Sequence, residues 1–399
     1  MHNGSMTVTP FVIDVPQSDL DDLRARLRAT RWPDAAVSDW SQGIPPAALR
    51  RVLDYWAEEY DWRAVERQLN TLTHVTVDGI HAVRAGTPGA TPLLLVHGWP
   101  DSFVRFLRAL PPLADRFELV IPSIPGYGFS AQPAEPLGPI GVADRFVDLM
   151  SQLGHERFAV HGGDIGTQIA DQLGLRHPDR ITALHLGDVP LRRLRGIDPA
   201  EQTPEEQQWS KDGAAWELAE GAYSHLQRTK PQTLAAALND SPAGLAAWIL
   251  EKFEAWSDKG LDAFTLDDLA TNLTIYWVTQ TAGSAARYYY DNTVTPTGRQ
   301  VVPTGFAVFP ADICPPPPGS ASRWYPVERW TQMPRGGHFG PWEEPELWAA
   351  EMRAFFRSAG AVTRGGFRSP RAPPSRRSAS RRNRRRGPSA ARYSTSVRA

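Results

Sequence analysis

The segment HGGDIG at residues 161–166 constrains this chain most, because it joins a strand-like run to a helical pattern. The preceding residues, 158–160, are apolar, and the helical pattern covers residues 167–177. Glycines on both sides of Asp164 permit the sharp strand-to-helix turn that lifts one side chain above the end of a sheet. The segment therefore predicts a carboxylate at the end of a central strand.

Asp164 has two interpretations at this point. A carboxylate needs no base to act as a nucleophile, and it suits attack on an electrophilic sp3 carbon, which would join Asp164 to the substrate through an ester. An aspartate just before a helix is also a favoured N-cap residue. The rest of the chain decides between a catalytic and a capping role.

The fold class follows from strand-like runs that alternate with helical patterns. The run LLLV at residues 93–96 is apolar without alternation, as expected for a central parallel strand covered on both faces. The alternation predicts an α/β fold, with a mostly parallel central sheet, helices on both faces and right-handed crossovers. The strand-like runs are residues 74–77, 80–85, 93–97, 119–122, 158–161, 181–186 and 303–310.

The same patterns divide the chain into five regions. A helical N-terminal segment, 1–72, precedes the first part of the sheet core, 73–187. Polar, helical sequence at 188–294 interrupts the alternation after the nucleophile turn, which is where a helical lid over the sheet end would be inserted. The second part of the core, 295–358, is followed by an arginine-rich tail, 359–399, whose composition predicts disorder.

Composition excludes several kinds of protein. With one cysteine, Cys314, the chain can form no internal disulfide and no multi-cysteine zinc site. No stretch reaches the ~18 uninterrupted apolar residues of a membrane span, and the first residues lack a signal-peptide core, so we expect a soluble, cytoplasmic protein. Residues 364–399 hold 12 arginines and no acid, but nothing upstream indicates specific nucleic-acid binding. The sequence leaves a homodimer open.

Two further residues form a constellation with Asp164. Asp312 follows the last strand-like run, and His338 follows two glycines further along the chain. The order nucleophile, acid, histidine is the chain order of α/β-hydrolases. His338 would activate water to hydrolyse the ester, and Asp312 would orient and stabilise its imidazolium form. Asp188, which also follows a predicted strand, is a rival for the acid role.

HGWP at residues 97–100 follows another predicted strand and resembles the HGxP oxyanion motif. The backbone N–H groups of Trp99 and Ile165 would bind the oxyanion that forms when water attacks the ester of Asp164. The alternative is a constrained turn without a catalytic role. We favour the oxyanion interpretation because the motif and the nucleophile turn both end predicted strands.

Taken together, these motifs resemble an epoxide hydrolase of the α/β-hydrolase fold, on the branch of the microsomal and juvenile-hormone enzymes, with an N-terminal epoxide hydrolase segment. The resemblance covers about residues 10–358, and many motifs in one order are more specific than any single motif. It is carried by Pro10-Phe11 through Trp32-Pro33, HGWP at 97, PSIPGYGFS at 122, HGGDIG at 161, DSPAGLAAWILEKF at 240 and RGGHF at 335.

The resemblance implies hydrolysis of an epoxide to a vicinal diol without a metal or other cofactor. It also implies two lid tyrosines that protonate the ring oxygen. Tyr223 in GAYSHLQ and Tyr289 in RYYYDN match them, although Tyr288 and Tyr290 flank the second. A tyrosine with a pKa near ~10 can protonate the strongly basic alkoxide and still remain protonated at neutral pH. The aromatic lid suggests that the epoxide is a small apolar molecule.

Two other functions remain open on the sequence alone. A haloalkane dehalogenase shares the fold and an aspartate nucleophile, but it typically holds the halide with a tryptophan after the nucleophile, where this chain has Ile165. A non-catalytic binding protein of the same fold would give no reason to keep Asp164, Asp312 and His338 together. Two candidate tyrosines and an intact triad therefore favour the epoxide hydrolase.

Overall fold

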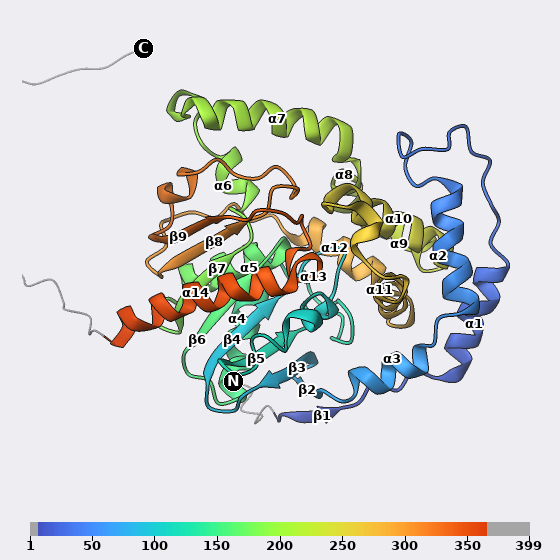
Figure 1. Cartoon of the computed structure of the whole chain (residues 1–399), viewed down its shortest axis with the longest axis horizontal. Coiled ribbons are helices and arrows are strands. Elements are labelled where there is room, and N and C mark those ends of the chain that lie inside the picture. The colour runs from blue at the N-terminus through green and yellow to red at the C-terminus, as the bar shows by residue number, and fades with distance from the viewer. Residues whose placement is uncertain (1–6, 365–399) are drawn as a thin grey trace, which may run out of the picture. The chain divides into compact units, whose positions relative to one another are not determined.

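The computed structural model describes residues 7–364, and within them a nine-stranded sheet runs in the order β1-β2-β3-β5-β4-β6-β7-β8-β9 (Figure 1). Neighbours from β1 to β5 in this order pair antiparallel, and all pairs from β5 to β9 are parallel. The strands are β1 (Thr9–Phe11), β2 (Thr73–Val77), β3 (Ile80–Gly86), β4 (Thr91–Val96), β5 (Phe117–Pro122), β6 (Phe158–Gly162), β7 (Ile181–Leu186), β8 (Thr304–Val308) and β9 (Val327–Gln332).

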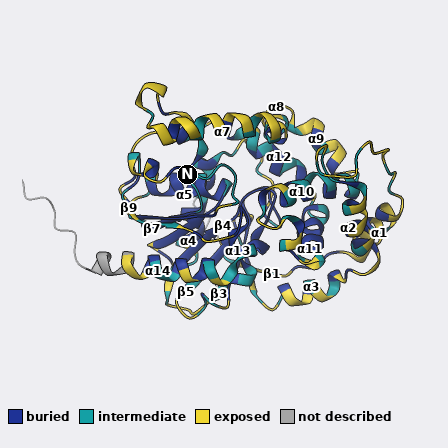
Figure 2. Cartoon of the chain, turned by 45° about the horizontal axis from the view of Figure 1, so that its top comes forward, coloured by how far each residue is buried: buried dark blue, intermediate teal, exposed yellow. Residues whose placement is uncertain are grey.

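Helices cover the parallel part of the sheet. Figure 2 shows the strands as a mostly buried layer, with exposed residues gathered on the helices around it. The apolar runs of β4 and β6 are fully buried because of this cover, and the expected mostly parallel sheet is confirmed. Helices α5 (Ile165–Arg176) and α14 (Pro345–Arg364) pack on the parallel strands. Helix α4 (Pro139–Gln152) packs on α5, while η1 (Phe103–Ala109) and α13 (Gly340–Glu343) pack on each other and on α14.

The N-terminal segment departs from the expected all-helical pattern in two places. Its first element is strand β1, which pairs with β2 and is too short to show alternation in the sequence. The helical sequence between Leu49 and Leu69 forms two helices rather than one, because Asp61 accepts a hydrogen bond from Ala64 N and caps a new helix. The three helices are α1 (Gln17–Arg28), α2 (Pro46–Glu58) and α3 (Trp62–Leu69).

The chain between β7 and β8 is helical. Helices α10 and α11 pack against α2, and Trp56 Nε1 donates to Thr274 Oγ1 at 2.8 Å, so this segment rests on the N-terminal helices. Helix α12 packs on α8 and α9. The elements are α6 (Leu191–Arg195), η2 (Pro199–Glu201), α7 (Pro204–Glu220), α8 (Ala222–Thr229), α9 (Pro231–Leu238), α10 (Pro242–Trp256), η3 (Gly260–Ala263), α11 (Leu266–Val278) and α12 (Ala282–Asp291).

The C-terminal part of the sheet holds an element that the sequence did not predict. Strand β9 pairs with β8 after η4 (Ser320–Arg323), and its sequence VERWTQ is half-buried and polar, as an edge strand allows. Helix α14 continues to Arg364, beyond the boundary expected at residue 358. The rest of the arginine-rich tail, 365–399, lies outside the described residues. Within residues 7–364, the helices are too short or too polar to cross a bilayer.

Candidate active site

Asp164 lies at the turn between β6 and α5 with a left-handed φ of 56°. Glycines allow the close backbone contacts of this turn. A Cβ on Gly162 would collide with the backbone of Gly166, and one on Gly166 would collide with Val96 O. The Asp164 side chain does not cap α5 but turns toward Trp99. The side chain of Asp164 therefore does not have the capping role.

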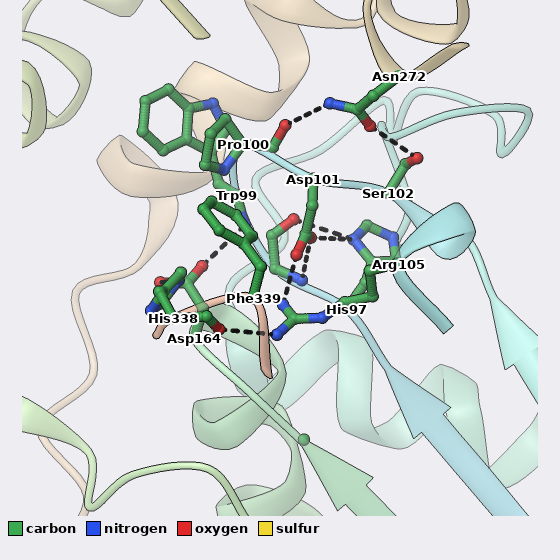
Figure 3. A network of polar contacts seen from close by, with 12 residues as sticks. His97, Trp99, Pro100, Asp101, Ser102, Arg105, Asp164, Asn272, His338 and Phe339 are labelled. Atoms are coloured by element: carbon green, nitrogen blue, oxygen red, sulfur yellow. Dashed lines mark hydrogen bonds and ion pairs between the residues drawn. The ribbon is translucent and has the colours of Figure 1, made fainter. Parts of the chain in front are cut away.

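Trp99 follows β4 and holds the carboxylate of Asp164 through its backbone. Trp99 N donates to Asp164 Oδ1 at 2.7 Å (Figure 3). The backbone N–H of Ile165 also faces this carboxylate and favours its charged form. A Cβ at position 98 would collide with Asp164, so Gly98 allows this close approach. The two expected oxyanion donors thus converge on one carboxyl group.

His338 lies between two carboxylates. Its Nδ1 is 2.6 Å from Asp312 Oδ1, and its Nε2 is 3.7 Å from Asp164 Oδ2. Nε2 has no hydrogen-bond partner among the described residues, so it is free to take a proton from a water molecule. Burial opposes the charged form of the ring, but the charge and hydrogen bond of Asp312, with the charge of Asp164, raise the pKa of His338 to about 9.

The carboxylate of Asp164 is largely buried but not fully closed off. Burial raises the pKa of the Asp164 carboxyl, while the charge of His338 and the two backbone N–H groups oppose that rise. The side chain keeps 18% of its surface exposed, against 4% for His338. The carboxylate of Asp164 is therefore more accessible than the ring of His338.

Asp188, the rival acid, lies beside the constellation without contacting the ring nitrogen. It shares the lining of a small cavity with Asp164, Asp312 and His338, and a cavity of ≈ 10 Å³ is about the size that one water needs. Burial, then the charges of Asp312 and Asp164, raise the pKa of Asp188 to about 8. The carboxylate that accepts the hydrogen bond of His338 Nδ1 is that of Asp312 instead.

Tyr223 and Tyr289 come together over Trp99. The ring of Tyr223, from α8, stacks on Trp99 with centroids 5.1 Å apart and planes 6° apart. Tyr289, from α12, meets Trp99 edge-on at 5.8 Å and Tyr223 at 6.1 Å. Burial, with the charge of Asp164 among the other causes, raises the pKa of both hydroxyls, so both are protonated at neutral pH.

Among the described residues, neither neighbour of Tyr289 makes a ring contact with Trp99 or Tyr223. Tyr290 is 56% exposed. Tyr288 is buried and its ring packs against Tyr127 at 6.4 Å. Tyr289 is therefore the member of the YYY run whose ring meets Tyr223 at Trp99, and its role as a proton donor stays a prediction.

Sequence reasoning missed three residues around this constellation. Trp256, at the end of α10, packs edge-on against the His338 ring at 5.2 Å, and its carbonyl accepts from His338 N at 2.8 Å. Asp101 and Arg105 form a buried ion pair beside HGWP. Their spacing of four residues with opposite charge, directly after the motif, was a signal that could have identified them.

Two family models match the chain. The model described as "Epoxide hydrolase N terminus" matches residues 8–106, and the model described as "alpha/beta hydrolase fold" matches residues 91–296. The first covers β1, the N-terminal helices and HGWP. The second covers the nucleophile turn and the whole of the helical segment 188–294.

Relatives with the same architecture cover most of the chain. A putative epoxide hydrolase of Stigmatella aurantiaca is 38% identical over 88% of this chain and 85% of its own length. Epoxide hydrolase 1 of Oryctolagus cuniculus is 35% identical, covering 88% of each protein. The crystal structure of juvenile hormone epoxide hydrolase from Bombyx mori superposes with a TM-score of 0.80 at 29% identity, over 90% of this chain and 96% of that one.

These likenesses agree with the order of motifs and with the sheet. The expected α/β-hydrolase fold is confirmed by the family model and by the superposition on the Bombyx mori enzyme. The relatives match at both the N-terminal segment and the hydrolase core, which excludes a likeness limited to one common domain. The chain therefore belongs to the epoxide hydrolases of the α/β-hydrolase fold.

Proposed function

We propose that this enzyme hydrolyses a small apolar epoxide to a vicinal diol through a covalent ester on Asp164. The main observation behind this proposal is that a backbone N–H and a histidine ring approach the two different oxygens of one carboxylate. Trp99 N holds Oδ1 at 2.7 Å, and His338 Nε2 lies 3.7 Å from Oδ2. One group can steady the nucleophile and later an oxyanion, while the other can activate water.

In the first step, an oxygen of Asp164 attacks a ring carbon of the epoxide. The new C–O bond forms as the ring C–O bond breaks, and its electron pair moves to the ring oxygen. Tyr223 and Tyr289 would protonate that oxygen, because their rings meet over Trp99 next to the carboxylate. Their raised pKa values keep the protons in place until a base as strong as an alkoxide forms.

In the second step, His338 takes a proton from water through Nε2, and the hydroxide attacks the carbonyl carbon of the Asp164 ester. The N–H groups of Trp99 and Ile165 would bind the resulting oxyanion. Collapse of the intermediate breaks the acyl C–O bond and releases the diol. One proton of the water protonates the leaving oxygen of the diol, and the other reprotonates the tyrosine, so the enzyme returns to its starting state.

Loss of the Asp164 charge prepares His338 for the second step. In the free enzyme, Asp164 and Asp312 both raise the pKa of the imidazole. An ester carries no charge, so the histidine loses one of these two carboxylates when the nucleophile is alkylated. His338 then becomes a neutral base at a lower pH than in the free enzyme.

The helical segment 188–294 would act as the lid of this site. It supplies Tyr223, Tyr289 and Trp256, and their rings make the wall opposite the carboxylate aromatic. An aromatic wall favours an apolar ring substituent over a charged one.

A single-turnover reaction in heavy-oxygen water tests the mechanism. Purified enzyme in excess would be mixed with a generic aryl epoxide, and the peptide that carries Asp164 would be analysed by mass spectrometry. We expect heavy oxygen in Asp164 and ordinary oxygen in the diol, because water attacks the ester carbonyl. Heavy oxygen in the diol alone would show direct attack of water on the ring and would refute the ester.

A further inference from the structure

Asp101 and Arg105 form an ion pair beside the nucleophile that the proposed chemistry does not use. Both residues are buried, with 0% and 1% of their surface exposed. Burial alone would raise the pKa of the Asp101 carboxyl, but Arg105, His97 and Gly98 N hold it below its ordinary value. Removing two charges from water costs free energy, so burial of the pair is weak evidence by itself that it stabilises the fold.

Asp101 acts on the loop that carries the first oxyanion donor. Its Oδ1 accepts from Gly98 N at 2.9 Å, and its Oδ2 accepts from Arg105 Nη1. Gly98 directly precedes Trp99, whose N–H holds the nucleophile. The carboxylate therefore fixes the peptide unit next to the one that faces Asp164.

Arg105 acts on the loop that carries the base. Its Nη2 donates to the carbonyl oxygen of His338 at 3.0 Å, more than two hundred positions further along the chain. The guanidinium passes over Gly163, where a Cβ would lie 3.3 Å from Nη2. A planar fork can bond a carboxylate through one nitrogen and a carbonyl through another, which an ammonium group does less well.

Figure 3 shows that these bonds form one path from the Trp99 loop to the His338 loop. One loop follows the central strand β4 and the other follows the edge strand β9, and they meet on opposite oxygens of Asp164. The path runs from Gly98 through Asp101 and Arg105 to the His338 carbonyl.

We propose that Asp101 and Arg105 are positioning residues that set the placement of the oxyanion donor and of the catalytic base around Asp164. This role rests on the proposed ester mechanism. Arg105 touches the histidine loop and no reacting atom, and His338 acts only in hydrolysis of the ester. Loosening Arg105 should therefore slow hydrolysis more than ester formation, so that the ester accumulates.

The experiment compares two arginine-to-lysine variants by rapid quench and mass spectrometry of the ester. Arg105→Lys keeps a positive charge beside Asp101 but loses the second bond of the fork. Arg193→Lys is the matched control, because Arg193 forms an ion pair with Asp171 at 3.0 Å and both side chains are fully buried. A generic aryl epoxide is the substrate, and thermal melting of each protein measures stability.

For Arg105→Lys we expect ester hydrolysis to fall about tenfold or more, since small misplacements of a catalytic group have effects of this order, while ester formation changes less than about threefold. Arg193→Lys should melt earlier than wild type yet keep the wild-type ratio of the two rates. If both variants shift that ratio equally, or Arg105→Lys slows both steps alike, the pair is merely structural and the proposal fails.

The wild-type enzyme separates this proposal from the mechanism beneath it. Wild type that turns over the epoxide without an ester on Asp164 would refute the proposed function, and the positioning role with it. Wild type that forms the ester, with Arg105→Lys hydrolysing it at the normal rate, would refute the positioning role alone. Arg105→Met serves as the stronger variant: we expect it to accumulate more ester than Arg105→Lys.

Discussion

The two walls of the site are built in different ways. On the sheet side, Asp164, Asp312 and His338 stand on loops after strands and are held by hydrogen bonds to backbone and carboxylate groups. On the helical side, Tyr223 and Tyr289 come from separate helices and are held by ring contacts. The side chains of the sheet side are polar and oriented by hydrogen bonds, and those of the helical side are aromatic and held by packing.

This difference separates two kinds of catalytic work. In the proposed mechanism, the sheet side would handle bond formation to Asp164 and the activation of water, two steps that depend strongly on the direction of approach of the reacting atoms. The helical side would supply a proton and an apolar surface, and two neighbouring hydroxyls could share the proton donation. We therefore expect substitutions on the sheet side to stop single steps, and substitutions on the helical side to slow one step by degrees.

The largest effect is expected at the nucleophile. Asp164→Ala removes the atom that forms the ester, and the loss of product formation should be about 10⁴-fold or more, as for other essential nucleophiles. The assay is diol release over hours, with the circular dichroism spectrum to verify folding. Diol formation by this variant at more than a few per cent of the wild-type rate would mean that the sheet wall does not provide the nucleophile.

The next largest effect is expected at the base. His338→Gln keeps a polar side chain but removes the group that activates water, so ester formation should continue while hydrolysis falls about 10³-fold. Intact-protein mass spectrometry should then show the enzyme with one substrate added. A variant that releases diol at the normal rate, or that forms no ester, would contradict the separate roles of Asp164 as nucleophile and His338 as base.

The helical wall should respond more weakly. Tyr223→Phe or Tyr289→Phe alone should slow ester formation about tenfold to a hundredfold, because the other hydroxyl remains, and the double variant should be far slower than either. Tyr290→Phe is the control, since Tyr290 is 56% exposed. Pre-steady-state rates of ester formation decide the matter, and a Tyr290 effect as large as that of Tyr289 would contradict the assignment.

The smallest effect expected is a shift along the pH axis. Hydrolysis needs neutral His338, so its rate should rise with pH through the pKa of that ring. The pKa is about 9 in the free enzyme, where the charge of Asp164 contributes to raising it. In the ester that charge is gone, and the midpoint should fall by about one to three pH units. Ester decay measured from pH 5 to 10 would contradict this if its midpoint stayed at 9.

The two walls also differ in how far the sequence predicts them. Asp164 and His338 stand near glycines that their turns require, and this local signal, together with the order of Asp164, Asp312 and His338 along the chain, predicts them from the residues alone. Tyr223 has no such signal, because its place depends on a ring stacked on Trp99 from a distant part of the chain. The resemblance to a family, and not the pattern, supplied the tyrosines.

The missed elements have similar causes. Strand β1 is three residues long, and β9 is a polar edge, so neither displays the apolar run that marks a central strand. Asp101 and Arg105 lie close together in sequence, but the carbonyl that Arg105 bonds belongs to a residue near the other end of the chain. Contacts between such distant segments depend on the tertiary fold, which local spacing does not encode.

The packing of α10 on the N-terminal helices has a consequence for the base. Trp256, the last residue of α10, accepts the hydrogen bond of His338 N, and Phe253 on the same helix stacks on Phe339 at 4.3 Å. Helices α1 and α2 therefore support the position of His338 indirectly, because they pack on α10 and α10 contacts the histidine. Removal of the N-terminal helices should therefore leave Asp164 in place but remove the packing that supports α10 and, through it, His338.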